Sequence, residues 1–160
     1  MENFTHKKMI IGVDLSTYSL ALATINDNEV KTTLLTSKKK EWMERYKDLF
    51  FQFHNKISEI KQESNLSIFI EEPPFVQNHQ TFSKLIRALS ICEQTCFLNN
   101  IPFFIINNKT WKAGLMGGNA TKSDIKDFAK LIFGDMIESL TPDEIDALCI
   151  ARWGYLRINS

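Results

Sequence analysis

Three strand-like segments stand at the start of the chain, before any helical pattern. Residues 8–14 contain the continuous apolar run Met9–Val13, which is typical of a strand buried on both faces. Residues 20–25 alternate larger side chains with small ones, and residues 30–35 follow after the polar turn Asn26-Asp27-Asn28. Because the connections between them are short, we expect these three strands to pair as an antiparallel meander.

The remainder of the chain alternates helical and strand-like patterns. Ser37 is the expected cap of a long helix that ends near Lys61 and carries one apolar stripe. Further helices are expected at about 81–99, 110–115, 122–133 and 141–155, and further strands at 67–70 and 101–106. Three antiparallel strands followed by αβ units predict an α/β protein with a mixed five-stranded sheet flanked by helices. This order resembles the ribonuclease H-like topology.

The composition is that of one ordinary globular domain over residues 1–160. The chain is 44% apolar and 24% charged, which excludes a disordered or collagen-like protein. No apolar run approaches the roughly 18 residues of a membrane span, and Glu2 and Asp14 argue against a secretory signal. Cys92, Cys96 and Cys149 are expected to be core thiols in a reducing compartment, so a cytoplasmic location is predicted.

Charge is balanced over the whole chain but uneven along it. Nineteen basic residues meet nineteen acidic ones, which by itself argues against a nucleic-acid-binding protein. Residues 101–133 nevertheless carry five lysines against two aspartates, whereas residues 134–160 carry five acids against two arginines. Such an asymmetry could pair a basic phosphate-binding face with an acidic metal site.

The first turns of the last helix are acidic. Thr141 is the expected N-cap and Glu144 completes a capping box, so Asp143 and Glu144 can simply serve helix initiation. Asp146 is different, because it lies on the apolar stripe that must face the core, with Asp143 one turn earlier on the same face. Since a buried carboxylate is costly unless a cation neutralises it, Asp146 is expected either in a buried salt bridge or beside a metal ion.

Two more acids end apolar strands, Asp14 the first and Glu71 the fourth. Strand-end acids are often merely solvated, but a ribonuclease H-like sheet would make these strands neighbours under the last helix. That arrangement would bring Asp14, Glu71, Asp143 and Asp146 together. Carboxylate oxygens suit Mg²⁺ or Mn²⁺, and two such ions about 4 Å apart can promote phosphodiester hydrolysis. Two bound ions would neutralise the four acids, so the balanced total charge would no longer argue against DNA.

Several motifs occur in order from about residue 8 to residue 155. They are Ile11-Gly12-Val13-Asp14, Ile70-Glu71, Trp111-Lys112, Ala120-Thr121-Lys122 and Asp143-x-x-Asp146-Ala147-Leu148-x-Ile150-Ala151. In this combination the chain resembles the RuvC-like Holliday junction resolvases, a family with bacterial, phage, poxviral and mitochondrial members. A phage or viral member would work in the host cytoplasm.

The resemblance implies a homodimeric, Mg²⁺-dependent endonuclease that nicks a four-way DNA junction symmetrically and leaves 5′-phosphate ends. It assigns Asp14, Glu71, Asp143 and Asp146 as catalytic metal ligands. It also implies two Mg²⁺ ions in each site, with Mn²⁺ as a substitute. Branched DNA and a second copy of the chain are the implied partners, with no membrane and no nucleotide cofactor.

The resemblance also implies three DNA-binding residues. Lys112 and Lys122 fall where the family has lysines that contact phosphates, and such contacts give affinity rather than sequence reading. Phe75 falls where the family has an aromatic residue near the junction centre. Stacking on an unpaired base and plain packing both remain open for Phe75.

The chain departs from the family's pattern at two places. Leu15-Ser16-Thr17 replaces a turn that usually contains glycine, and the helix expected at 81–99, where the dimer interface is expected, lacks a midway glycine. A nuclease for other branched DNA or RNA–DNA hybrids remains an alternative, as does a non-catalytic junction-binding protein. An actin-like or sugar-kinase-like ATPase is a further alternative, but the chain lacks a second phosphate loop and a second domain.

Overall fold

The computed structural model describes residues 7–27 and 29–160, so Glu2 and Asn28 lie outside the described residues. Within them the elements follow in the order strand, strand, strand, helix, strand, helix, strand and four helical segments. They are β1 (Lys7–Leu15), β2 (Ser19–Ile25), β3 (Val30–Thr36), α1 (Trp42–Glu63), β4 (Ser64–Glu71), α2 (His79–Asn99), β5 (Phe103–Ile106), α3 (Asn108–Leu115), α4 (Lys122–Phe133), the 3₁₀ helix η1 (Gly134–Ser139) and α5 (Pro142–Ile158).

The strands form one mixed sheet in the order β3-β2-β1-β4-β5. β1 pairs antiparallel with β2, and β2 pairs antiparallel with β3, so the predicted meander is confirmed. β4 runs parallel to β1 on its other side, and β5 runs parallel to β4. The predicted mixed five-stranded sheet is therefore present.

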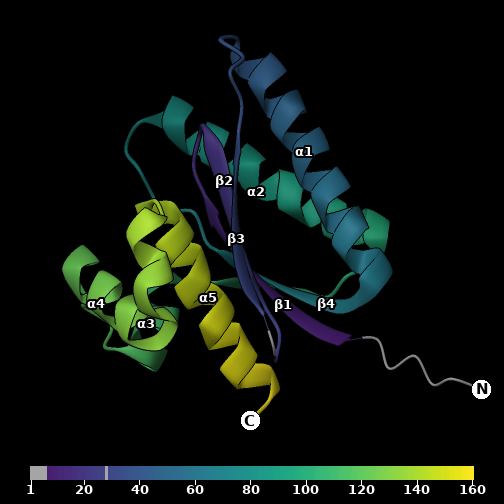
Figure 1. The fold of residues 1–160 in the computed structure, drawn as a ribbon. Coiled ribbons are helices and arrows are strands. Elements are labelled where there is room, and N and C mark those ends of the chain that lie inside the picture. Colours follow the sequence, from purple (N-terminus) through teal and green to yellow (C-terminus); the bar gives the residue numbers. More distant parts are fainter. Residues whose placement is uncertain (1–6, 28) are drawn as a thin grey trace, which may run out of the picture.

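Helices cover both faces of this sheet. Figure 1 shows α5, with α3 and α4 beyond it, on one side and α1 with α2 on the other. β1 supplies both cores, because Ile10 belongs to the apolar cluster under α5 whereas Ile11 and Val13 belong to the cluster under α1 and α2. This double burial explains why β1 reads as a continuous apolar run rather than an alternating one.

Some element boundaries differ from the predicted ones. The prediction that Ser37 caps the first long helix is wrong, because α1 begins at Trp42 and the Ser37 hydroxyl instead bonds the Asp48 carboxylate at 2.5 Å. The fifth strand begins at Phe103 rather than Ile101, since the Ile101 N–H donates to the Cys96 carbonyl and so completes the end of α2. η1 was not predicted. Residues 37–41 consequently form a loop between β3 and α1.

Candidate active site

Asp14 and Glu71 lie at the same edge of the sheet. Both belong to the carboxyl ends of their strands, and β1 and β4 are parallel neighbours with Val13 opposite Ile70. Asp14 and Glu71 follow directly after that pair. The register thus places the two strand-end acids side by side, as expected from the sequence.

Small residues bring α5 close to β1. A Cβ atom built on Gly12 would lie 2.2 Å from the Ala147 carbonyl oxygen and 2.4 Å from the Ala151 nitrogen, both backbone atoms of α5. Any side chain on Gly12 would therefore force the helix away from the strand. Because α5 lies directly on β1, its first turns reach the strand end that carries Asp14.

The acids at the start of α5 differ in their roles. Thr141 is the N-cap and Glu144 closes a capping box with it, as predicted. The second Glu144 oxygen accepts the Thr32 hydroxyl at 3.1 Å, so Glu144 ties the helix to β3. Helix initiation thus accounts for Glu144. Asp143 lies in the same acidic first turn, whereas Asp146 lies beyond it and has no such explanation.

Electrostatic coupling among the four acids is strong. Burial raises the pKa of Asp14 from 3.8 to about 8, with added repulsion from Glu71, Asp146 and Asp143. Burial and the Glu71 charge raise the pKa of Asp146 to about 6, against which the Lys112 and Lys122 charges act. Both lysines therefore lie within electrostatic reach of the acids, on the side of Asp146.

None of these four acids forms an ion pair within residues 7–27 and 29–160. The ion pairs there join Lys31 to Glu29, Lys56 to Glu59, and Lys126 and Lys130 to Glu138. The buried salt bridge considered for Asp146 is thus absent from the described chain. In the same part of the chain, no three His, Cys, Asp or Glu side chains are arranged to hold an ion as they stand.

Two donors from α3 fix the Glu71 carboxylate. The Trp111 indole N–H donates to one oxygen at 2.6 Å, and the Asn108 amide donates to the other at 3.1 Å. Trp111 is fully buried, so this side of the carboxylate is held rigidly. The sequence did not predict this role for either residue. The only available signal was a polar residue shortly after the last strand.

Two hollows lie beside the acids. Glu71 and Phe75 are among the residues that line one hollow of about 670 Å³, and Lys122 and Asp146 are among those that line another of about 280 Å³. The Phe75 side chain is 80% exposed, although its ring centroid lies 5.7 Å from that of Phe82. Phe75 thus projects into solvent near Glu71 instead of being buried as a core residue.

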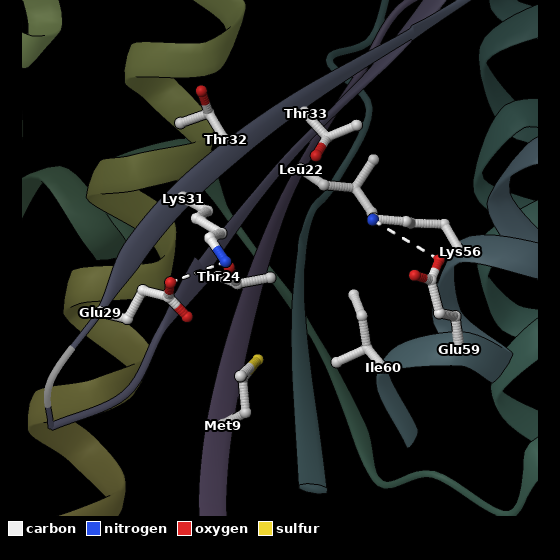
Figure 2. A pocket seen from close by; sticks show the side chains of 10 residues that line it. All are labelled: Met9, Leu22, Thr24, Glu29, Lys31, Thr32, Thr33, Lys56, Glu59 and Ile60. Carbon is white, nitrogen blue, oxygen red and sulfur yellow. Dashed lines mark ion pairs between the residues drawn. The ribbon is translucent and has the colours of Figure 1, made fainter. Parts of the chain in front are cut away.

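A third hollow, of about 280 Å³, lies at the opposite end of the sheet (Figure 2). Met9, Leu22 and Ile60 are among its apolar lining residues. Its charged lining residues occur as the ion pairs Lys31–Glu29 and Lys56–Glu59. None of the predicted site residues lines this hollow.

Comparison with known proteins identifies the fold. No family model and no curated protein sequence matches the chain. Among solved structures, T. thermophilus RuvC in complex with a Holliday junction substrate matches with a TM-score of 0.79 and 18% identity, over 96% of this chain and 97% of that one. A second Thermus thermophilus RuvC structure gives a TM-score of 0.72 and 20% identity, over 94% and 96% of the two chains.

The chain has the RuvC fold. The predicted ribonuclease H-like topology is thereby confirmed, with a mixed five-stranded sheet flanked by helices. At this level of identity, the likeness to RuvC concerns the fold, so the roles of the four acids, the two lysines and Phe75 stay predictions. Cys92, Cys96 and Cys149 are buried free thiols, as expected. No helix within the described residues has the length and apolar character needed to cross a membrane.

Proposed function

We propose that the protein is a structure-selective DNA endonuclease that resolves four-way junctions. One observation carries the proposal: four electrostatically coupled carboxylates lie at one sheet edge, and none of them forms an ion pair in the described chain. Two of them have strongly raised pKa values, which is characteristic of functional sites. The RuvC fold supports the same reaction class, because a protein of this fold has been solved with a Holliday junction substrate.

The donor set suits divalent ions, and we assign Asp14, Glu71, Asp143 and Asp146 as the residues that would hold Mg²⁺ or Mn²⁺. Their oxygens are hard ligands, and the buried acids repel one another in the absence of a cation. Two bound ions would supply charge neutralisation and Lewis acidity at the scissile phosphate. Trp111 and Asn108 would keep the Glu71 carboxylate oriented for this task.

The chain's other residues bind and orient the substrate. Lys112 and Lys122 would contact the phosphates on either side of the scissile bond, because both already lie within electrostatic reach of Asp146. Water would attack the phosphorus in line and break the bond to the 3′ oxygen, leaving a 3′-hydroxyl and a 5′-phosphate. Phe75, which is exposed beside Glu71, would stack on an unpaired base at the junction centre.

Symmetric cutting requires two active sites, so we propose that a second copy of the chain pairs with this one through α2. Ile86 and Phe97 are exposed large apolar residues along this helix. Apolar side chains of this size favour a protein contact over solvent. Each copy would then present one set of carboxylates to one strand of the junction.

The test is a cleavage assay on a labelled immobile four-way junction with Mg²⁺, beside a linear duplex of the same sequence. We expect paired, symmetric nicks in the junction alone. In Asp146→Asn, cleavage should fall at least about a hundredfold because a metal ligand is lost, while binding of the junction should persist. Binding without nicks in either Mg²⁺ or Mn²⁺ would leave a junction-binding protein. Equal cutting of the duplex, of flaps or of RNA–DNA hybrids would remove the selectivity for four-way junctions.

A further inference from the structure

A basic loop lies at the same end of the sheet as the four acids and has no role in the proposed reaction. It joins β3 to α1 and contains Lys38, Lys39 and Lys40, all exposed. Ser19 at the start of β2 pairs with Thr36 at the end of β3, and Leu15 pairs with Leu20. This register places the loop beside the carboxyl end of β1. Figure 1 shows it at the upper end of the sheet, next to the start of α1.

Arg45 holds this loop in place. Only 6% of Arg45 is exposed, and in the described chain its guanidinium has no carboxylate partner. It donates instead to backbone carbonyls, to Thr17 at 3.3 Å, to Lys39 at 3.2 Å and to Lys40 at 3.4 Å. A buried arginine thus joins the turn that follows Asp14 to the loop that carries the lysines.

Aromatic rings surround the same guanidinium. Arg45 lies over the Tyr18 ring, 4.4 Å from its centroid, and 6.0 Å from the centroid of Trp42. Lys84, from α2, lies 5.6 Å from the Trp42 ring. Tyr18 is nevertheless 64% exposed, so most of its ring remains open to a ligand. Cations interleaved with exposed aromatic rings are typical of surfaces that follow a nucleic-acid strand.

The charge of the loop region is positive overall. Residues 37–48 contain five basic residues against Glu41, Glu44 and Asp48. The Ser37 hydroxyl, with help from Gln52 and Lys39, holds the pKa of Asp48 below its usual range. Lys38, Lys39, Lys40 and Lys84 take part in no ion pair within the described part of the chain. Their charges are therefore available to a polyanion.

We propose that Lys38, Lys39 and Lys40, together with the exposed ring of Tyr18, form a second DNA contact surface beside the carboxylates. It binds the sugar–phosphate backbone of the strand that leaves the reaction centre, with Arg45 as the residue that positions both segments. We name DNA as the polyanion because the surface lies next to the proposed cleavage site. Thr17, whose carbonyl accepts a hydrogen bond from Arg45, is three residues beyond Asp14. The inference rests on the proposed function, since it assigns the substrate's path past the same site.

The test compares two triple variants in EDTA, where binding is measured without cleavage. K38A/K39A/K40A removes the loop charges, and K8A/K56A/K61A removes three charges at the other end of the sheet as a matched control. Binding of a labelled four-way junction is followed by fluorescence anisotropy between about 50 and 200 mM salt. Each lost phosphate contact reduces the slope of log affinity against log salt by about 0.9, so the loop variant should lose about 2 to 3 in slope. The control should keep the wild-type slope.

Two single variants separate charge from position. Arg45→Lys keeps the net charge but cannot bridge three carbonyls, so a reduced salt slope in this variant would report a displaced loop. Tyr18→Ala should weaken junction binding at least about fivefold, whereas Tyr18→Phe keeps the ring and should bind as wild type does. If Arg45→Lys fails to fold, the lysine comparison still decides the matter.

The outcomes distinguish this proposal from the proposed function. If the wild-type protein cuts junctions and the two triple variants have equal salt slopes, the second contact surface is wrong and the nuclease stands. If the wild-type protein neither binds nor cuts DNA, both proposals are wrong. A slope lost in the loop variant alone, with the wild-type protein binding but not cutting, supports the contact surface and overturns the nuclease.

Discussion

Both ends of the sheet carry acidic side chains, but the acids at one end form ion pairs with lysines, whereas those at the other end lie beside further acids. At the end of the sheet away from Asp14, in the hollow of Figure 2, Glu29 forms an ion pair with Lys31 and Glu59 with Lys56. At the carboxyl end of β1, the acids lie beside one another, and burial together with their mutual repulsion raises the pKa of Asp14 to about 8. Exposed ion pairs contribute little to stability, whereas uncompensated buried acids cost stability. Acids maintained at such a cost point to function.

The largest effect is expected from Gly12→Ala, which attacks the packing that creates the acidic end. The new methyl group would meet the Ala147 carbonyl oxygen at 2.2 Å, and a helix backbone cannot yield locally. We expect a loss of about 3 kcal/mol or more in the free energy of unfolding, measured by urea denaturation. Gly118→Ala is the matched control, because its nearest neighbour would be the Ala113 side chain at 3.7 Å. Equal stability of the two variants would show that α5 does not depend on this close approach.

A second prediction concerns pH and uses Asp14→Asn. The pKa of Asp14 is raised from 3.8 to about 8 in the folded chain. Well below pH 3.8 the acid is protonated in both the folded and the unfolded state, so it has no effect on stability there. As the pH rises towards 8, the unfolded chain ionises while the fold retains the proton, so the wild-type free energy of unfolding falls. The Asp14→Asn variant does not lose stability in this way, because asparagine does not ionise.

In EDTA, we therefore expect Asp14→Asn to be more stable than wild type by about 2 kcal/mol or more at pH 8, and by less than about 1 kcal/mol at pH 4. Urea denaturation at the two pH values measures the difference. Glu59→Gln, at the paired end of the sheet, should change stability by less than about 0.5 kcal/mol at both. A difference for Asp14→Asn that is the same at pH 4 and pH 8 would contradict the electrostatic account.

The smallest effect is expected from Asn108→Ala, which tests whether the orientation of the Glu71 carboxylate matters for cleavage. It removes the donor at 3.1 Å from one Glu71 oxygen and leaves the Trp111 bond in place. Junction cleavage should fall about tenfold at limiting Mg²⁺, with partial recovery as Mg²⁺ increases. The melting temperature should barely change. Asn119→Ala, in an exposed loop, is the control, and cleavage equal to that control at every Mg²⁺ concentration would refute the orienting role.

Local signals predicted much of this end of the molecule. The apolar run before Asp14 and the capping box at Thr141 and Glu144 are both encoded within a few residues, and the structure has both where the sequence places them. The predicted helix cap at Ser37 is wrong, because the Ser37 hydroxyl donates to the carboxylate of Asp48, eleven residues away. Local pattern alone cannot choose between a cap and such a side-chain bond.

The long-range side-chain hydrogen bonds were not predicted. The bond from Trp111 to Glu71 joins residues 40 positions apart in the chain, and the Arg45 bond to Thr17 spans 28. The sequence contains Gly12, but only the fold reveals that helix backbone approaches it. The sequence therefore predicted which acids gather, whereas the groups that position them and the nearby lysine loop required the structure.

The central claim is that the uncompensated acids form a divalent cation site. Calorimetric titration of the DNA-free protein with Mn²⁺ at pH 7.5 tests it most directly, in wild type, in D14N/D146N and in the control E29Q/E59Q. We predict that Mn²⁺ binds to wild type and to the control with release of protons, because a bound cation lowers the pKa of Asp14, which is about 8 in the ion-free chain. D14N/D146N should show neither the binding nor the proton release. Equal Mn²⁺ binding by D14N/D146N and wild type, or no binding by wild type, would contradict the account.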